Sequence, residues 1–269
     1  MGIFDKLFGS KKNEKPTHNE IKEVNSIKPT DEKKEVSKKV KFYLETFSED
    51  DTPGWSAIDK ELEKLYEKDS ERHYATVVKQ IFGGKDPIDG FNIYDNSEQT
   101  FHRHIISYGM SELYFNPKSA DDEFSKWGFE FTMRIIPFNG DKPAEKKDGS
   151  IAQNEPYWVM NLMQNLARYV FSSGNHFDPY HFIPTNSPIR GETDTKLVGI
   201  AFVPDVQLNT IDTPNGKVQF LQMVGLTQKE LDWLWEDPTT SRVKELIDKM
   251  RVDNPMLIVD LNREKEYVD

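Results

Sequence analysis

Cysteine is absent from the 269-residue chain. Disulfides, thiolate nucleophiles and cysteine-ligated zinc are therefore excluded. The absence fits a reducing compartment, so we expect a cytoplasmic protein. No stretch of about 18 consecutive apolar residues occurs, which predicts that no helix spans a membrane. The first residues also lack the apolar core and the small-residue cleavage site of a secretory signal.

Sequence motifs of the common enzyme classes are missing too. The chain contains no hydrolase nucleophile elbow, no Walker loop, no dinucleotide-binding glycine pattern and no His-Glu-x-x-His zinc motif. Gly83-Gly84-Lys85 has the wrong spacing for a Walker loop and is typical of a turn. No pair of carboxylates stands out among the 46 acidic residues. We therefore predict a protein that is not an enzyme and that needs no cofactor.

Charge is distributed unevenly along the chain. The formal net charge is −11, but residues 9–41 carry ten lysines and only six acidic residues, so the part from Phe42 onward carries −15. Affinity for phosphate needs clustered lysine and arginine, so the acidic body argues against nucleic acid as a partner. It favours a basic protein partner, with plain solubility as the alternative.

The N-terminal residues 1–41 differ in composition from the rest. Residues 1–9 carry four apolar side chains that a short amphipathic helix would place on one side, so contact with a membrane or a partner is one alternative and a frayed terminus is the other. Residues 10–41 are rich in Lys, Glu, Asn and Pro, which predicts a disordered or partly helical charged linker. The folded domain is expected over residues 42–269.

Apolar residues at helical spacing predict four helices in this domain. The first follows Pro53-Gly54-Trp55, with Ser56 as its cap and with an apolar face formed by Ile58, Leu62, Leu65 and Tyr66. The others run from Pro156 to Gly174, from the capping box Thr227–Glu230, and over residues 239–250.

Strand patterns alternate irregularly with these helices. Strands are expected at residues 73–81, 91–94, 101–110, 128–136, 196–203, 206–211, 217–224 and 256–261, with a polar loop at 139–155. The alternation over 128–136 is typical of a half-buried strand, and Thr213-Pro214-Asn215-Gly216 indicates a hairpin turn. The order of elements favours an α+β fold, with one mixed, mainly antiparallel sheet packed by helices.

Six blocks of sequence, in this order, carry a specific likeness. They are PGWSAID (53–59), DPIDG (86–90), HRHIISYGMSELY (102–114), GFEFTMR (128–134), NLMQNLARYVF (161–171), and TPNG with FLQMVG (213–216 and 220–225). The set resembles the Suppressor of Fused domain family over about residues 50–265, which is nearly all of the expected folded domain.

The resemblance implies a compact α+β domain that binds proteins. The animal member of the family sequesters a zinc-finger transcription factor, and a second domain helps to clamp a short peptide of that factor. Bacterial relatives are proposed to be immunity proteins, or antitoxins, that bind and neutralise toxins. The resemblance therefore implies a non-catalytic binding module of bacterial type, whose partner is a toxin or another basic protein.

Candidate partner-binding residues follow from the same resemblance. Tyr114 ends the Ser-Glu-Leu-Tyr block, where the resemblance implies a tyrosine on the peptide-binding surface, and tyrosine is a common interface anchor. Asp121, Asp122 and Glu123 occupy a loop where the family places an acidic contact residue, and they would steer a basic ligand. A core tyrosine and a solvated loop are the alternatives.

Histidines supply the rival hypothesis, a metal-dependent hydrolase. His102 and His104 lie two apart, so a strand would place both on one face, and His176 can add a third ligand. Structural, hydrogen-bonded histidines are the alternative, and we predict no metal site. An internal ion pair between Arg168 and Glu130 is also expected.

Overall fold

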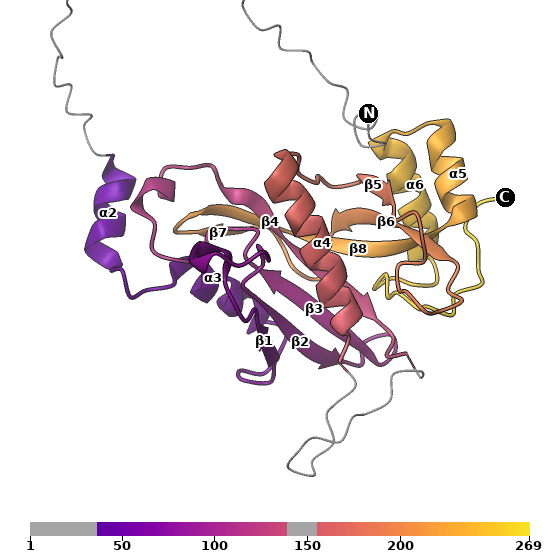
Figure 1. Ribbon diagram of the computed structural model, residues 1–269, viewed down its shortest axis with the longest axis horizontal. Helices are drawn as coiled ribbons and strands as arrows, with labels where there is room; N and C mark the ends of the chain where they lie inside the picture. The colour runs from indigo at the N-terminus through magenta and orange to yellow at the C-terminus, as the bar shows by residue number, and fades with distance from the viewer. Residues whose placement is uncertain (1–36, 139–154) are drawn as a thin grey trace, which may run out of the picture. The chain divides into compact units, whose positions relative to one another are not determined.

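A mixed sheet of eight strands forms the centre of the protein (Figure 1). The computed structural model describes residues 37–138 and 155–269. The predicted segment 1–9, the linker up to residue 36 and the loop at 139–154 lie outside the described residues. The described residues belong to one compact unit, Val36–Asp269.

The strands are arranged in the order β1-β2-β3-β4-β8-β6-β5, and β7 also pairs with β8. β4 and β8 pair in parallel, and the other strand pairs are antiparallel. The predicted α+β fold with a mixed, mainly antiparallel sheet is therefore confirmed. The strands are β1 (Arg72–Ala75), β2 (Gly90–Asn96), β3 (His102–Tyr108), β4 (Phe124–Ile135), β5 (Phe182–Pro184), β6 (Leu197–Pro204), β7 (Ile211–Thr213) and β8 (Gly216–Thr227).

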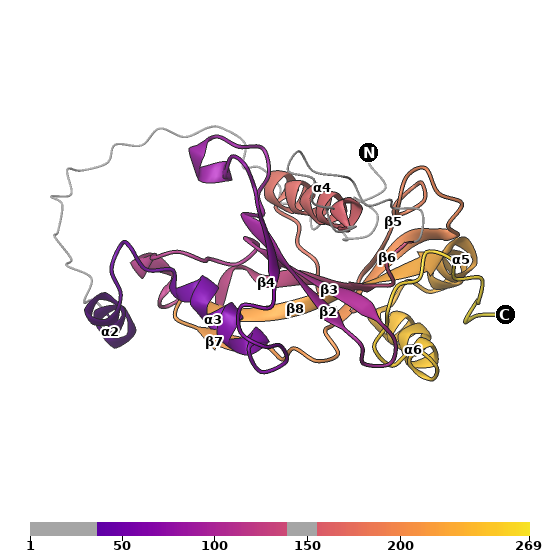
Figure 2. The ribbon, with the colours of Figure 1, turned by 90° about the horizontal axis from the view of Figure 1, so that it is seen from below.

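Five helices of the described residues accompany the sheet, and α4 lies on the face opposite α3 and α6 (Figure 2). Within residues 37–138 and 155–269, none of them has the length and apolarity of a membrane span. The helices are α2 (Lys38–Thr46), α3 (Pro53–Leu62), α4 (Tyr157–Ser173), α5 (Gln228–Glu236) and α6 (Thr240–Arg251), with short 3-10 turns η1 (Gln80–Phe82) and η2 (Pro117–Ser119).

Two apolar clusters hold the helices of one face to the sheet. Near α3, Ile58 and Leu62 pack with residues of β2, β3 and β8. Near α5 and α6, Leu231 and Leu246 pack with residues of β6 and β8. Burial of this apolar surface is the main driving force for docking the helices.

Strand β4 is buried on both faces, which corrects the prediction of a half-buried strand. Phe131 and Met133 are buried on one face, and Glu130, Thr132 and Arg134 are equally buried on the other. The second face is covered by chain segments that supply hydrogen-bond partners to these polar side chains. Alternation along a strand separates its two faces, but it does not show whether water reaches the polar one.

Two predicted elements begin or end at different residues in the structure. Helix α3 begins at Pro53 with Thr52 as its N-cap, so the predicted cap Ser56 lies inside the helix. Proline suits the first turn because its missing N–H has no helical partner there. The strand predicted over 73–81 is limited to β1, and η1 follows it.

Helix α2 begins at Lys38, so the last residues of the segment assigned to the linker are helical. Two other predictions differ from the structure. The strand expected over 206–211 is replaced by irregular chain and the short β7. The strand expected over 256–261 is reduced to one bridge between Ile135 and Val259.

Candidate partner-binding surface and the network beneath it

Tyr114 follows the loop after β3 and is partly buried. Its hydroxyl donates a hydrogen bond to Asp89 Oδ2 at 2.7 Å and also contacts Lys79 Nζ, which lies 4.7 Å from the ring centroid. Burial, followed by the hydrogen bond to Asp89 and its charge, raises the pKa of the Tyr114 hydroxyl. The side chain is therefore held in one orientation with part of its surface accessible.

The three consecutive acidic residues Asp121, Asp122 and Glu123 lie between η2 and β4, and all are exposed as expected. Ser37 Oγ donates to Asp121 Oδ1 at 2.7 Å, and the Lys217 N–H donates to the Glu123 carbonyl at 2.9 Å. No Lys or Arg of the described residues forms an ion pair with these carboxylates. Their charge is therefore available to a ligand.

Asn215 joins the two parts of this surface, and the sequence analysis missed this role. Its side-chain Nδ2 donates to the carbonyls of Glu112 and Tyr114 at 2.9 and 3.0 Å. Its Oδ1 accepts from the hydroxyls of Tyr43 and Ser119. The Pro-Asn-Gly pattern predicts a turn here, but it does not reveal the hydrogen-bond partners of Asn215, which lie on three distant segments.

The loop between β3 and Tyr114 is anchored to β4 by Glu130. The Glu130 carboxylate is fully buried and accepts from the N–H groups of Gly109, Met110 and Ser111 and from the hydroxyls of Ser107 and Ser111. Burial raises the pKa of Glu130, although these donors offset part of that shift. Glu130 therefore shapes the loop that leads to Tyr114, and it does not pair with Arg168.

The predicted ion pair between Arg168 and Glu130 is wrong, because Arg168 has another partner. Its guanidinium contacts Asp86, and both side chains are about two-fifths exposed. Helix α4 covers the opposite sheet face from Glu130, so the two side chains point away from each other. An exposed pair such as Arg168–Asp86 contributes about 0–1 kcal/mol.

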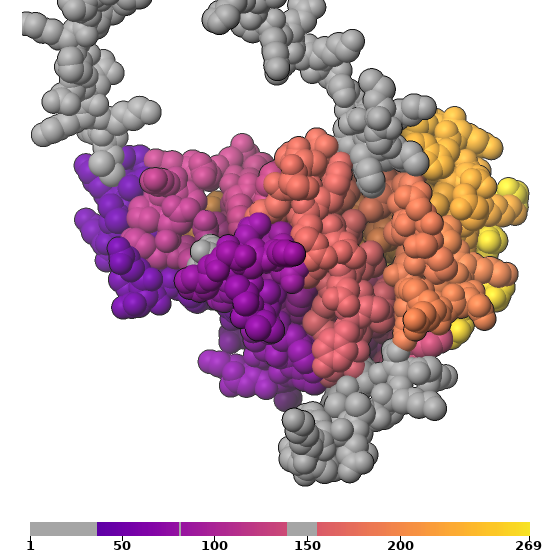
Figure 3. All heavy atoms as spheres, viewed as in Figure 1, coloured from indigo at the N-terminus to yellow at the C-terminus, as the bar shows by residue number. Residues whose placement is uncertain are grey.

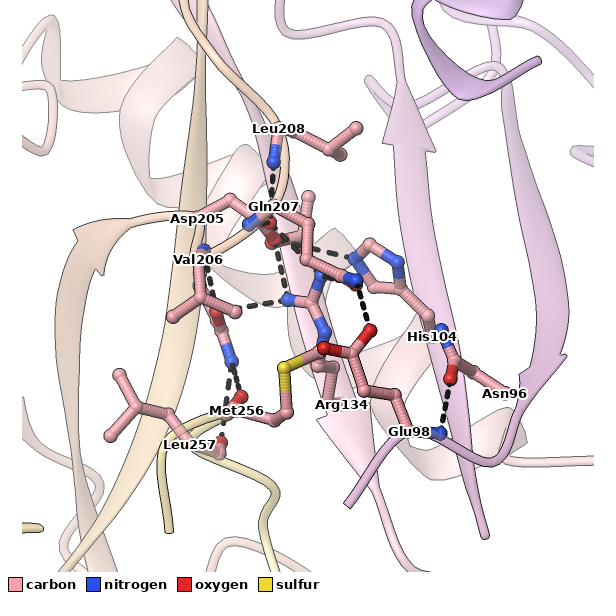
Figure 4. A network of polar contacts seen from close by, with 12 residues as sticks. Asn96, Glu98, His104, Arg134, Asp205, Val206, Gln207, Leu208, Met256 and Leu257 are labelled. Carbon is pink, nitrogen blue, oxygen red and sulfur yellow. Dashed lines mark hydrogen bonds and ion pairs between the residues drawn. The ribbon is translucent and has the colours of Figure 1, made fainter. Parts of the chain in front are cut away.

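A second buried network centres on Arg134 and Asp205 (Figure 4). Arg134 Nη1 and Nη2 donate to the two Asp205 carboxylate oxygens at 2.7 and 3.0 Å, and both side chains are fully buried. Gln222 and Gln207 each accept one further bond from Arg134. The pair therefore joins β4 and β8 to the chain segment after β6.

Asp205 has several donors besides Arg134. It accepts from Thr132 Oγ1. It also accepts from the N–H groups of Gln207 and Leu208 (Figure 4). Burial alone would raise the pKa of Asp205, but His104 and Arg134 outweigh burial and hold the pKa well below its usual range. The carboxylate is therefore ionised and well satisfied in its buried position.

His104 completes this network as a structural residue. Its Nδ1 lies 2.8 Å from the Tyr66 hydroxyl, and its Nε2 lies 3.3 Å from Asp205 Oδ2. Burial and the neighbouring Arg134 lower the pKa of His104 to about 4. The imidazole is therefore neutral in the folded protein at pH 7.

We expect His104 to make the protein less stable in acid. Below about pH 6.5 His104 binds a proton in the unfolded chain but stays neutral in the folded protein. The free energy of unfolding therefore decreases as the pH falls towards 4. This residue alone should remove about 3 kcal/mol of unfolding free energy over that interval. Urea unfolding of the wild type and of His104→Gln between pH 7 and 4.5 measures the difference in slope.

The exposed His176 provides the control for that experiment. His176→Gln removes an imidazole that is about half exposed, so it controls for the loss of a histidine outside the buried network. Equal slopes for the wild type and His104→Gln would contradict the assignment.

The histidine cluster of the rival hypothesis, His102, His104 and His176, is not brought together. His102 Nδ1 lies 2.8 Å from the Thr100 carbonyl, and His104 is engaged by Tyr66 and Asp205. His176 instead lies beside Asp178, with Nε2 3.5 Å from Oδ2. Among the residues that the structure describes, no group of three or more His, Asp or Glu side chains is arranged to hold a metal ion.

The chain is similar to known proteins over most of its length. Residues 84–264 match the sequence model of the family described as Suppressor of fused protein (SUFU). The human Suppressor of fused homolog is 31% identical over 221 residues, which cover 78% of this chain and 43% of the human protein. The chain thus spans less than half the length of that relative.

Solved structures show the same likeness. The Sufu–Fu complex matches with a TM-score of 0.67 and 27% identity, covering 81% of this chain and 93% of the other. Drosophila Suppressor of Fused matches with a TM-score of 0.66 and 28% identity, covering 82% and 52%. A homolog from Neisseria gonorrhoeae shares the fold, with a TM-score of 0.52 and 15% identity over 80% and 97%.

Proposed function

The chain belongs to the Suppressor of Fused family, and from that membership we propose that it is a protein-binding module that holds a partner without transforming it. One similar structure is the Sufu–Fu complex, so a relative of this chain is found in a complex. The described residues add an exposed, unpaired acidic segment and a tyrosine held in one orientation. Both features suit binding more than catalysis.

The proposed contact surface consists of Tyr114, Asp121, Asp122 and Glu123. The single observation that carries this proposal is the run of three exposed carboxylates that lack ion pairs within the described residues. Asn215 ties the carbonyl of Tyr114 to Ser119, close to these carboxylates in the chain, which supports a proposed surface with a restrained backbone. Preorganisation lowers the entropic cost of binding.

We further propose that the partner is a basic protein in the cytoplasm, and specifically a toxin that this chain neutralises as an immunity protein. The charge of −15 from Phe42 onward supports a basic partner. Co-expression tests the finer statement, because this chain should restore growth of cells that produce the toxin. A toxin that kills equally well with and without this chain would contradict the proposed immunity role.

The acidic contact surface can be tested on the partner once it has been captured with the full chain and identified. Neutralising all three carboxylates (Asp121→Asn, Asp122→Asn and Glu123→Gln) should slow association at least about fivefold at low salt and weaken its salt dependence. Tyr114→Ala should instead raise the dissociation rate, because an anchoring contact is removed. Stopped-flow or surface-plasmon measurements at several salt concentrations separate these effects.

A matched control changes three exposed acidic residues on α5 and α6. The control removes the same number of negative charges from α5 and α6. It combines Asp232→Asn, Glu245→Gln and Asp248→Asn. This variant should change the association rate less than about twofold. If both triple variants slow association equally, net charge and not this surface is responsible.

A further inference from the structure

A hollow lies between α2 and the turn that joins β7 to β8. It has a volume of about 490 Å³, and its apolar lining includes Phe42, Phe47, Ala120 and Pro214. Helix α2 forms one wall and packs against η2, as the indigo and magenta atoms in Figure 3 show. The hollow therefore opens beside the proposed acidic contact residues.

Phe42 gives this hollow an exposed apolar wall. The phenylalanine is 66% exposed, although large aromatic side chains are usually buried. A partner that covered Phe42 would gain the free energy of removing that ring from water. The hollow thus offers contact area that the protein itself leaves uncovered.

The rim of the hollow is mainly acidic. Asp121, Asp122, Glu123 and Asp212 line it, against the two cations Lys39 and Lys217. None of the four carboxylates forms an ion pair with a Lys or Arg within residues 37–138 and 155–269. An apolar ligand with cationic neighbours complements this arrangement, and an acidic ligand does not.

The floor is rigid. Tyr43 is buried beneath the hollow, donates to Asn215 Oδ1 at 2.7 Å and accepts from the Asn116 N–H at 3.0 Å. At the other end of α2, Ser37 caps the helix and bonds Asp121. The walls are therefore fixed to the floor before a ligand arrives, which favours a defined binding mode.

A second hollow lies beside the first. A neighbouring hollow of about 650 Å³ is lined by three of the same residues, Phe47, Asp212 and Pro214. Two hollows with a shared wall suit a chain segment better than one compact small molecule. Lys60 and Lys64 line the second hollow, so the carboxylates of the first hollow are the better place for cations of a ligand. We call the two neighbouring hollows together the α2 groove.

We propose that the α2 groove binds a segment of the partner that carries a large apolar side chain flanked by lysine or arginine. The inference rests on the proposed function and names the chemistry of the bound segment. The apolar side chain occupies the hollow beside Phe42. The flanking cations face Asp121, Asp122, Glu123 and Asp212.

A designed peptide tests this specificity without the natural partner. The probe is a fluorescein-labelled peptide of about twelve residues with two Lys and two Arg around a central Phe-Leu pair, measured by anisotropy against the full chain. Replacing Phe-Leu by Ala-Ala should weaken binding at least about tenfold, because a buried large apolar side chain contributes this much. Replacing the four cations by Glu should abolish binding. Equal binding of the Phe-Leu and Ala-Ala peptides, or no binding of the Phe-Leu peptide at about 1 mM protein, would overturn the proposal.

Two variants on the same helix locate the site. Phe42→Ser should weaken binding of the Phe-Leu peptide at least about fivefold. Leu44→Ser is the control, because Leu44 is 52% exposed on α2 but does not line the hollow. Its affinity should stay within about twofold of wild type. Circular dichroism confirms that both variants fold, and equal effects would overturn the assignment to the groove.

The outcomes also separate this inference from the proposed function. If a captured partner binds Phe42→Ser normally but binds the Asp121–Asp122–Glu123 variant weakly, the proposed binding function is supported. The proposal that the α2 groove holds the partner is then contradicted. Dimerisation that Phe42→Ser abolishes would assign the groove to a second copy of this chain and would overturn the proposal. Specific binding of the basic peptide with no protein partner in the cell would support the groove and count against the proposed function.

Discussion

Replacing Arg134 by methionine should lower the free energy of unfolding by about 3–5 kcal/mol, which is the usual cost of removing one partner from a buried ion pair. Methionine fills much of the space but donates no hydrogen bond. Asp205 then keeps its charge in a site without solvent and loses two charge-assisted bonds. Urea denaturation at pH 7 measures the loss directly.

A double variant shows whether the isolated charge is the cause. In Arg134→Met with Asp205→Asn, the asparagine oxygen still accepts from the N–H groups of Gln207 and Leu208, and no unpaired charge remains. We expect this variant to be at least about 1 kcal/mol more stable than Arg134→Met alone.

An exposed pair is the matched control for Arg134. Lys244→Met removes one partner of the pair with Asp248, and both side chains are about half exposed. This change should cost much less than Arg134→Met, because an ion pair that water reaches adds little to stability. A cost for Arg134→Met as small as that of Lys244→Met would contradict the role of the buried network.

Glu130→Ala should cost at least about 3 kcal/mol, because three buried N–H groups lose their acceptor and each unsatisfied group costs about 1–3 kcal/mol. The groups belong to Gly109, Met110 and Ser111. The loop that leads to Tyr114 should loosen as well, so partner binding should weaken together with stability. Urea denaturation and hydrogen exchange of the loop amides measure the two effects.

Glu130→Gln is the discriminating control. Its amide oxygen can replace Oε1, which accepts from Gly109 and Ser111, and its NH₂ group can donate to Ser107 Oγ in place of Oε2. Only the weaker bond from Met110, at 3.3 Å, is lost outright. The cost should be about 1 kcal/mol. If Gln and Ala destabilise equally, the hydrogen bonds are not what holds the loop.

The two networks explain why the polar face of β4 was wrongly expected to meet water. Glu130 and Arg134 obey the alternation of a half-buried strand, yet their partners come from residues about 20 and 70 positions away. The sequence pattern of the strand itself does not predict hydrogen-bond partners that lie so far away in the chain. The predicted Arg168–Glu130 pair failed for the same reason, because charge types alone do not tell which side of the sheet each residue faces.

Local signals were reliable where the physics is local. The Thr227–Glu230 capping box is present at the start of α5, and α4 ends at Gly174 in the left-handed conformation. Both depend on bonds or backbone preferences within four residues. The hairpin turn at Thr213–Gly216 follows equally from its own residues.

The sequence by itself determined the family, the α+β class, the main helices and the acidic character of the body, because these depend on ordered motifs, short-range periodicity and composition. Only the tertiary structure decided that His102 and His104 are buried in the core, that Asn215 ties Tyr114 to the segment before the acidic residues, and that Phe42 opens onto a groove. Each of these depends on contacts between residues far apart in the chain, and such contacts exist only after the sheet and its helices have packed.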